Sequence, residues 1–163
     1  MRFEVGCNTK EFREYWNRNG YDGNLDHLMN VVVKDKSQLI VWRENDKIVG
    51  HAVWHESNTE EHRKGDPRER EDTQALKKLL GEKKDFVELH EIWLIEEYRG
   101  KDYGEMFHDF FEKFMKDKGY SDIVFYAHHP AAVAICRKHG YKEGGYLEGL
   151  KEYAFYLSLK KNP

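Results

Sequence analysis

The chain has 163 residues, a formal net charge of −3 and a charged fraction of 35%. This length predicts one domain whose core needs no metal or disulfide support. The mildly acidic balance argues against nonspecific nucleic-acid binding. No apolar run is long enough to cross a bilayer, and Met1–Glu4 is not a signal peptide, so we expect no membrane partner. Two cysteines indicate no disulfide framework and favour a cytoplasmic location.

The first part of the chain predicts two helices and a hairpin. We expect a first helix that Thr9 caps and Gly20 ends, because these residue types favour helix starts and stops. Its apolar face consists of Phe12, Tyr15 and Trp16. A second helix is expected after residue 24, with helical spacing at Leu25, Leu28, Met29 and Val32. Strands are predicted over 38–42 and 48–54, joined by a polar turn.

A charged insertion follows at 57–85, between the third and fourth predicted strands. Its first half, 57–72, is almost without apolar residues. A short helix is expected after it, capped by Thr73, ended by Gly81 and apolar at Leu76, Leu79 and Leu80. A connection of about thirty residues greatly exceeds the roughly 2–5 of a hairpin. The insertion is either a functional lid or a solvated excursion, and we favour the solvated one.

The second half alternates strands and helices. A long strand is predicted over 86–95, and short ones at 123–127 and 153–159, the last preceded by another strand after residue 141. The helix after Gly104 has apolar residues at i, i+3, i+4 and i+7, namely Phe107, Phe110, Phe111 and Phe114. A further helix is expected over 131–138. This order requires a parallel strand pair flanked by helices and predicts an α/β fold.

A glycine-rich turn joins the long strand to its helix. The first N–H groups of a helix lack internal partners and attract phosphate. Arg99 and Lys101 add positive charge, and Gly100 and Gly104 let a ligand approach the main chain. The turn lies at the carboxyl end of a strand, where open α/β sheets bind ligands. It therefore predicts a phosphate site.

Two segments carry a family resemblance. Arg99-Gly100-Lys101-Asp102-Tyr103-Gly104 resembles motif A, Q/R-x-x-G-x-G/A, of the GNAT superfamily of acyl-CoA N-acyltransferases. His129–Tyr141 resembles its motif B, N-x-x-A-x-x-x-Y-x-x-x-G-F. The resemblance implies a mixed sheet of about six to seven strands, splayed between strands 4 and 5 and flanked by about four helices. We expect one acetyltransferase domain over 1–163.

The resemblance also implies acetyl-CoA as acyl donor. Main-chain amides of Arg99–Gly104 would hold its pyrophosphate. The pantetheine arm would follow the strand end at Trp93, Leu94 and Ile95, with the Leu94 N–H directed at the thioester oxygen. Motif B would contribute His129, Ala132 and Cys136.

Three positions depart from the family pattern. Asp102 replaces a glycine, and it either caps the helix away from the phosphates, which we favour, or competes for their donors. His129 replaces an asparagine and can still donate one hydrogen bond. Cys136 replaces the tyrosine that protonates the leaving thiolate in many relatives. Since a cysteine reaches less far, we expect it to line the cofactor channel, with water or a tyrosine such as Tyr126 as the acid.

Acetyl transfer to an amine requires a base, because free alkyl amines have a pKa of about 10.4. Glu88 and His90 share one face of the predicted strand, since side chains alternate. Glu88 lies near the position of the catalytic glutamate in several GNAT enzymes, so it is the first candidate and His90 the second. Glu91, expected on the opposite face, is the reserve. All three also suit ordinary polar positions of a strand.

The expected function is N-acetylation of an amine in a ternary complex with acetyl-CoA. One alternative is a CoA-binding regulatory protein without catalysis, suggested by Asp102 and the missing tyrosine. Another is a longer acyl donor. No metal is expected, since neither His51 and His55 nor His128 and His129 have a completing ligand. Homodimers are common in the family, so self-association is a further expectation.

Overall fold

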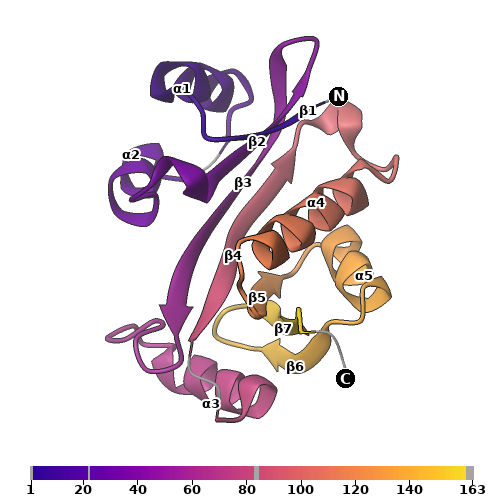
Figure 1. The fold of residues 1–163 in the computed structure, drawn as a ribbon. Helices are drawn as coiled ribbons and strands as arrows, with labels where there is room; N and C mark the ends of the chain where they lie inside the picture. The colour runs from indigo at the N-terminus through magenta and orange to yellow at the C-terminus, as the bar shows by residue number, and fades with distance from the viewer. Residues whose placement is uncertain (1, 22, 83–84, 161–163) are drawn as a thin grey trace. The chain divides into compact units, whose positions relative to one another are not determined.

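The computed structural model describes residues 2–21, 23–82 and 85–160. The chain forms two compact units, Met1–His55 with His90–Phe107, and Glu56–Leu89 with His108–Pro163. We call these the first and second units, and Figure 1 labels the helices and strands that they contain. Strands β3 and β4 and helix α4 contribute residues to both.

Seven strands form a mixed sheet in the order β1-β2-β3-β4-β5-β7-β6. Their bounds are Arg2–Val5 (β1), Leu39–Glu44 (β2), Lys47–Asn58 (β3), Asp85–Leu94 (β4), Asp122–Ala127 (β5), Lys142–Leu147 (β6) and Glu152–Ser158 (β7). β4 and β5 pair in parallel from Val87↔Ile123 to Leu89↔Phe125, and the other recorded pairs are antiparallel. The predicted α/β class is confirmed, whereas β1 was not predicted.

The first unit buries helix α1, Thr9–Arg18, against the amino-terminal strands. Its predicted apolar face is confirmed and packs in one core with Leu25, Leu28, Leu39, Val41, Ile48 and Val53. The cap is Asn8 rather than Thr9, since the Asn8 Oδ1 accepts hydrogen bonds from the N–H groups of Lys10 (3.0 Å) and Glu11 (3.1 Å). Helix α2, Leu25–His27, continues as a π-helical turn over Leu28–Val32.

The predicted hairpin joins β2 to β3. Asn45 and Asp46 occupy the left-handed region (φ +49° and +65°), which suits the tight turns that match strand twist. Farther along β3, Gly50 lies against β4. A Cβ there would lie 2.7 Å from the Leu94 Cδ2 and 2.8 Å from the Trp93 carbonyl oxygen, so only glycine fits without movement.

The second unit contains the charged insertion, and the prediction of a solvated excursion is wrong. Helix α3 spans Glu69–Leu80, so it begins before the predicted cap at Thr73, and it ends as predicted at Gly81 (φ +64°). Its apolar residues lie in a core with β4, β5, β6 and β7: Ala75, Leu76, Leu79, Leu80, Phe86, Val124, Tyr126, Leu147, Leu150, Ala154 and Tyr156. The polar residues Thr59, His62 and Asp72 are buried too.

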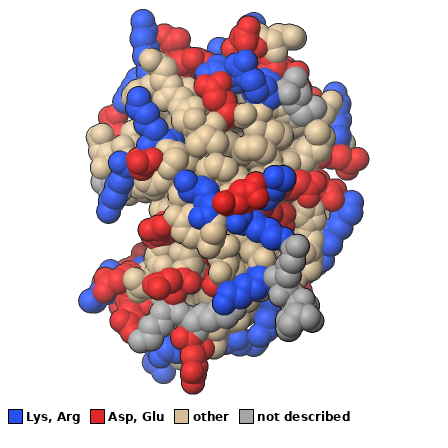
Figure 2. All heavy atoms as spheres, in the orientation of Figure 1, with Lys and Arg blue, Asp and Glu red and all other residues tan. Residues whose placement is uncertain are grey.

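Helices α4, Tyr103–Asp117, and α5, Pro130–Lys138, occupy the predicted segments. The buried stripe of α4 runs through Phe107, Phe111 and Met115, while Phe110 and Phe114 stack on each other. None of the helices in the described ranges has the length and apolar composition that a bilayer crossing requires. On the face seen in Figure 2, charges of both signs are interspersed.

Candidate active site

The predicted phosphate loop lies in the first unit. β4 ends at Leu94, a 3₁₀ turn covers Glu96–Tyr98, and α4 begins at Tyr103. The Arg99 Nε donates a hydrogen bond to the Leu94 carbonyl (2.9 Å), and its guanidinium lies 5.8 Å from the Trp93 ring centroid. Arg99 therefore fastens the loop to the strand end, and Lys101 is an exposed cation beside it.

Asp102 stands in the left-handed region, with φ +63°. Gly100 also has a positive φ of +75°. Glycine adopts this conformation without steric cost, which explains physically why the family motif has glycine at position 102. The Asp102 carbonyl accepts a hydrogen bond from the Met106 N–H (3.1 Å) and so begins α4.

The end of β4 has the orientation that the expected cofactor contact requires. The Ile95 N–H donates to the Val49 carbonyl of β3 (2.9 Å). Because successive N–H groups of a strand point to opposite edges, the Leu94 N–H points away from β3. Trp93 is 45% exposed, and Leu94 is buried.

Motif B lies in the second unit. His129 caps α5, since its Nδ1 accepts a hydrogen bond from the Ala131 N–H (3.2 Å). A neutral ring in this contact carries its hydrogen on Nε2, which can donate. Ala132 is half-buried. Cys136 is fully buried, and this burial raises the pKa of its thiol to about 12.

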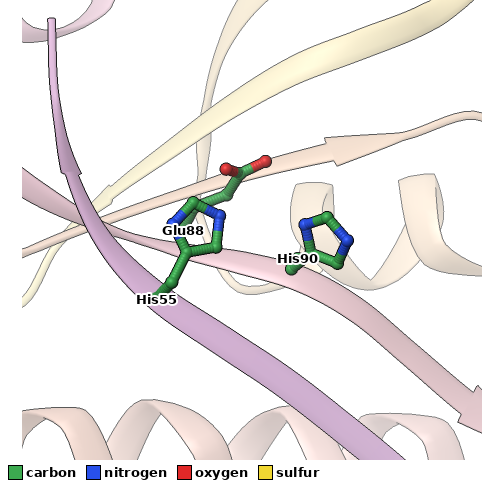
Figure 3. A group of neighbouring side chains, drawn as sticks. All are labelled: His55, Glu88 and His90. Atoms are coloured by element: carbon green, nitrogen blue, oxygen red, sulfur yellow. The ribbon is translucent and has the colours of Figure 1, made fainter. Parts of the chain in front are cut away.

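The candidate base residues lie along β4. Glu88 is buried, whereas His90 is exposed (Figure 3). His90 lies beside His55, with ring centroids 5.6 Å apart, and Glu91 contacts the Nε2 of His51. His51 and His55 lie on one face of β3, because side chains alternate along a strand. Their contact partners, Glu91 and His90, therefore point to the same side of the sheet although they are adjacent in sequence. β4 therefore has a bulge-like irregularity here, and the expectation that Glu91 lies on the opposite face is wrong.

His51 belongs to a buried polar chain in the first unit. Its Nδ1 lies 2.8 Å from the Tyr15 hydroxyl, which lies 3.0 Å from the Tyr21 hydroxyl. The Tyr21 ring contacts Trp93, with centroids 5.3 Å apart. Both His51 ring nitrogens thus have protein partners, Tyr15 and Glu91.

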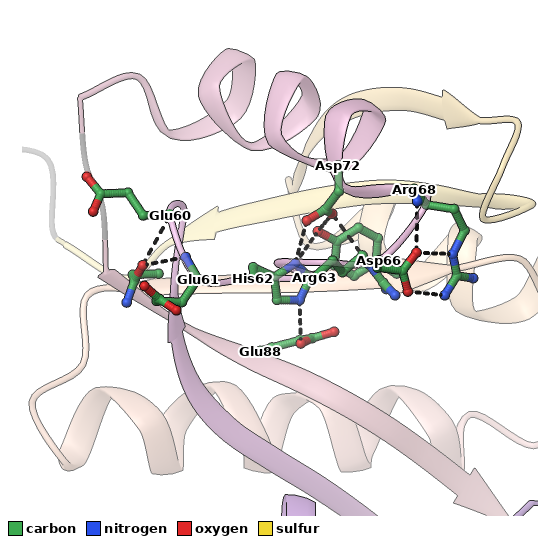
Figure 4. Close-up of polar contacts among 10 residues, drawn as sticks. Glu60, Glu61, His62, Arg63, Asp66, Arg68, Asp72 and Glu88 are labelled. Carbon is green, nitrogen blue, oxygen red and sulfur yellow. Dashed lines mark hydrogen bonds and ion pairs between the residues drawn. The ribbon is translucent and has the colours of Figure 1, made fainter.

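Glu88 belongs to a second buried cluster, formed within the second unit (Figure 4). The His62 Nε2 lies 2.8 Å from the Glu88 carboxylate, and its Nδ1 lies 2.6 Å from the Asp72 carboxylate. The Tyr126 hydroxyl donates to Asp72. Burial alone lowers the pKa of His62, but the hydrogen bonds and charges of Asp72 and Glu88 outweigh it and raise the pKa to about 9. His62 is therefore an imidazolium at neutral pH.

Sequence reasoning did not find His62 and Asp72. They lie ten residues apart in a charged segment, without the spacing of any motif. The one available signal was the apolar face of α3, because a helix that packs on a sheet also brings its first turn close to that sheet.

The family model "Acetyltransferase (GNAT) family" matches residues 5–141. No curated protein sequence matches the chain. Among solved structures, the fold is similar to that of an agmatine N-acetyltransferase, with a TM-score of 0.68 and 12% identity, covering 96% of this chain and 98% of that one. The fold is also similar to that of arylalkylamine N-acetyltransferase 2 from Aedes aegypti, with a TM-score of 0.65 and 13% identity, covering 98% of this chain and 99% of that one. A third similar structure is PaiA N-acetyltransferase from Thermoplasma acidophilum in complex with coenzyme A, with a TM-score of 0.57 and 18% identity, covering 93% of this chain and 80% of that one.

Proposed function

Because the chain belongs to the GNAT acetyltransferase family, we propose that it transfers an acetyl group from acetyl-CoA to an amine within a ternary complex. The observation that carries this proposal is the loop after β4. It combines Gly100 at positive φ, an exposed Lys101 and the open first turn of α4. Main-chain N–H groups at a helix start bind phosphate oxygens, so this loop suits the pyrophosphate of coenzyme A.

The remaining cofactor contacts follow from the strand end and motif B. The Leu94 N–H, directed away from β3, is the proposed donor to the thioester oxygen, where it stabilises the negative charge of the tetrahedral intermediate. Trp93 and Ile95 flank it along the pantetheine arm. From motif B we propose contacts by His129, Ala132 and Cys136, with His129 donating through Nε2.

Glu88 is the proposed general base and His90 the second candidate. An amine attacks only after it loses its proton, so a carboxylate or neutral imidazole must accept that proton directly or through water. Glu88 is paired with an imidazolium, which favours its ionised form. His90, exposed on the same strand, is the candidate in contact with solvent.

Water is the proposed proton source for the leaving thiolate. A Cys136 thiol with a pKa of about 12 is a much weaker acid than an ordinary thiol of pKa about 8.5. Burial also raises the pKa of the Tyr126 hydroxyl, which already donates to Asp72. Neither group therefore gives up a proton readily.

Primary alkyl amines are the acceptor class to test first. Two proteins of similar fold are named for agmatine and for arylalkylamines. Fold similarity does not establish a substrate, so the panel must also include polyamines, aminoglycosides, peptide N-termini and lysine side chains.

The test measures release of coenzyme A from acetyl-CoA with this panel. In Glu88→Gln we expect kcat to fall about 10²–10⁴-fold, because the base is lost, while the Kd for acetyl-CoA by calorimetry changes little. Glu148→Gln, at an exposed position of the same unit, is the matched control and should retain activity. Equal losses of kcat and binding in Glu88→Gln would remove Glu88 from the mechanism. Tight acetyl-CoA binding without turnover by the unmodified protein would favour a regulatory function.

A further inference from the structure

We propose that His62, carried by the charged insertion, is a positioning residue for Glu88. It holds the Glu88 carboxylate ionised and in one orientation, ready to accept the proton of the incoming amine. This inference rests on the proposed function, in which Glu88 is the base. It gives the connection between β3 and α3 a part in the chemistry.

The hydrogen-bond geometry fits a protonated His62 between two ionised carboxylates. Its two ring nitrogens each approach a carboxylate, at 2.8 Å for Glu88 and 2.6 Å for Asp72. Carboxylates only accept hydrogen bonds, and a neutral imidazole has only one N–H to donate. Both contacts are satisfied at once by an imidazolium between two carboxylates.

The charge of His62 also keeps Glu88 ionised. Glu88 is 6% exposed and Asp72 is fully buried, so both carboxylates are largely removed from water. Burial and a nearby negative charge each favour the protonated form of a carboxyl group. The Arg63 Nε lies 3.6 Å from Asp72. Without the charge on His62, both buried carboxylates would lose the cation that contacts each of them.

Two other groups of the second unit, Tyr126 and Glu152, do not replace that charge. From β5, Tyr126 donates to Asp72 as a neutral hydroxyl. From β7, Glu152 adds a further carboxyl group, whose pKa is raised chiefly by its burial. On β4, His90 follows Glu88 on the same face and lies beside His55 of β3.

The ring of His62 is fixed in position from two sides. The Tyr126 ring stacks on it in parallel, with an interplanar angle of 3° and centroids 5.5 Å apart. Phe86 meets it edge-on at 5.6 Å. Asp72 is anchored because α3 packs its apolar face into the core. A donor held this firmly restricts the orientation of its acceptor.

The proton transfer then involves Glu88 alone. His62 already carries both ring protons, so it is not the acceptor. The N–H bond of the substrate ammonium breaks, an O–H bond forms on Glu88, and the freed nitrogen lone pair attacks the thioester carbon. His62 acts before this step by keeping the accepting oxygen unprotonated.

The decisive variant is His62→Gln, whose amide can donate to Glu88 but carries no charge. When kcat is measured as a function of pH, we expect the acidic limb of this profile to shift to higher pH by about one unit or more, because Glu88 then binds a proton more readily. Consequently kcat should fall about tenfold at a pH on that acidic limb, with an unchanged Kd for acetyl-CoA. His27→Gln, at an exposed position of helix α2, is the control and should leave the profile in place. If the acidic limb of His62→Gln lies at the same pH as that of the wild type, the inference is overturned.

A second measurement does not depend on turnover. NMR of the ring nitrogens should show His62 as an imidazolium at neutral pH in the wild-type protein. Asp72→Asn should lower the pH at which His62 loses this proton. A neutral His62 ring in the wild type overturns the inference. Wild-type protein that turns over no amine, although His62 is an imidazolium, overturns the proposed function instead, and the catalytic role of His62 with it.

Discussion

Asp102 has a backbone conformation that favours glycine, in a loop proposed to bind a polyanion. A left-handed conformation costs an L-residue about 1–2 kcal/mol, and aspartate and asparagine tolerate it better than most. Its carboxylate also lies in the segment whose amides would face the pyrophosphate. Asp102 therefore adds strain to the loop, and if its carboxylate competes for those amides, against the favoured alternative, it also opposes cofactor binding through charge.

We expect Asp102→Gly and Asp102→Asn both to tighten acetyl-CoA binding, by about three- to tenfold, since each removes a negative charge near the phosphates. Asp102→Gly should in addition stabilise the fold, because it relieves the positive φ. Calorimetry at low and high salt provides the check, because a charge effect shrinks as salt screens it. Asp117→Asn, exposed at the far end of α4, serves as the control. Unchanged or weaker binding in both Asp102 variants would show that the carboxylate faces away from the cofactor.

At the scale of single residues, the sequence identified candidate site residues more readily than the side chains that contact them. Glu88 could be nominated from the resemblance, because it lies near the position of the catalytic glutamate in several GNAT enzymes. Its contact with His62 could not, because His62 lies 26 positions away within 57–72, a stretch almost without apolar residues. Cys136 illustrates the same limit, since a motif position does not reveal that the side chain is buried.

Among the elements, α3 determines whether the insertion is part of the second unit. Its residues Leu76 and Leu79 are 0% and 3% exposed. Leu79 packs so closely on β6 that a Cβ at Gly144 would lie 2.8 Å from its Cδ1. The helix thereby attaches the charged segment before it to the sheet.

Leu76→Ala should lower the free energy of unfolding by about 2–5 kcal/mol, because it leaves a cavity in a fully buried site. Lys77→Ala, the next residue and exposed, should change it by less than about 0.5 kcal/mol. Urea denaturation of both variants provides the comparison. If the two values were similar, α3 would not be packed as described.

Periodicity and turn chemistry predicted most elements, but not their ends. α1, α4 and the β2–β3 hairpin follow from apolar spacing and from Asn45-Asp46. β1 was missed because Arg2–Val5 is short and partly polar, and only its pairing with β2 defines it. The irregularity in β4 is equally a product of cross-strand contacts, which no local pattern encodes.

At the scale of the molecule, the predicted mixed sheet follows from the order of strands and helices, and the family match agrees with it. The acceptor could not be predicted. Side chains that recognise a substrate come together only in three dimensions, as those of Tyr15, Tyr21, His51 and Glu91 do in this fold.

The overall stability should fall as pH rises above neutral. The pKa of His62 is about 9 in the folded protein, against an ordinary value of about 6.5. The raised pKa contributes on the order of 3 kcal/mol to the free energy of unfolding below about pH 6.5, and this contribution is lost as pH rises through about 9. Urea midpoints across this range should decline in the wild type and remain flatter in His62→Gln. A wild-type midpoint that stays constant would contradict the raised pKa.

The burial of Glu88 against His62 makes one side chain dependent on a stretch of chain far from it in sequence. A shortened protein that lacks the excursion between β3 and α3 would keep a carboxyl group inside with no counterion. Such a shortened variant would need a replacement cation near residue 88, or an uncharged residue at position 88. The two regions can be altered only together.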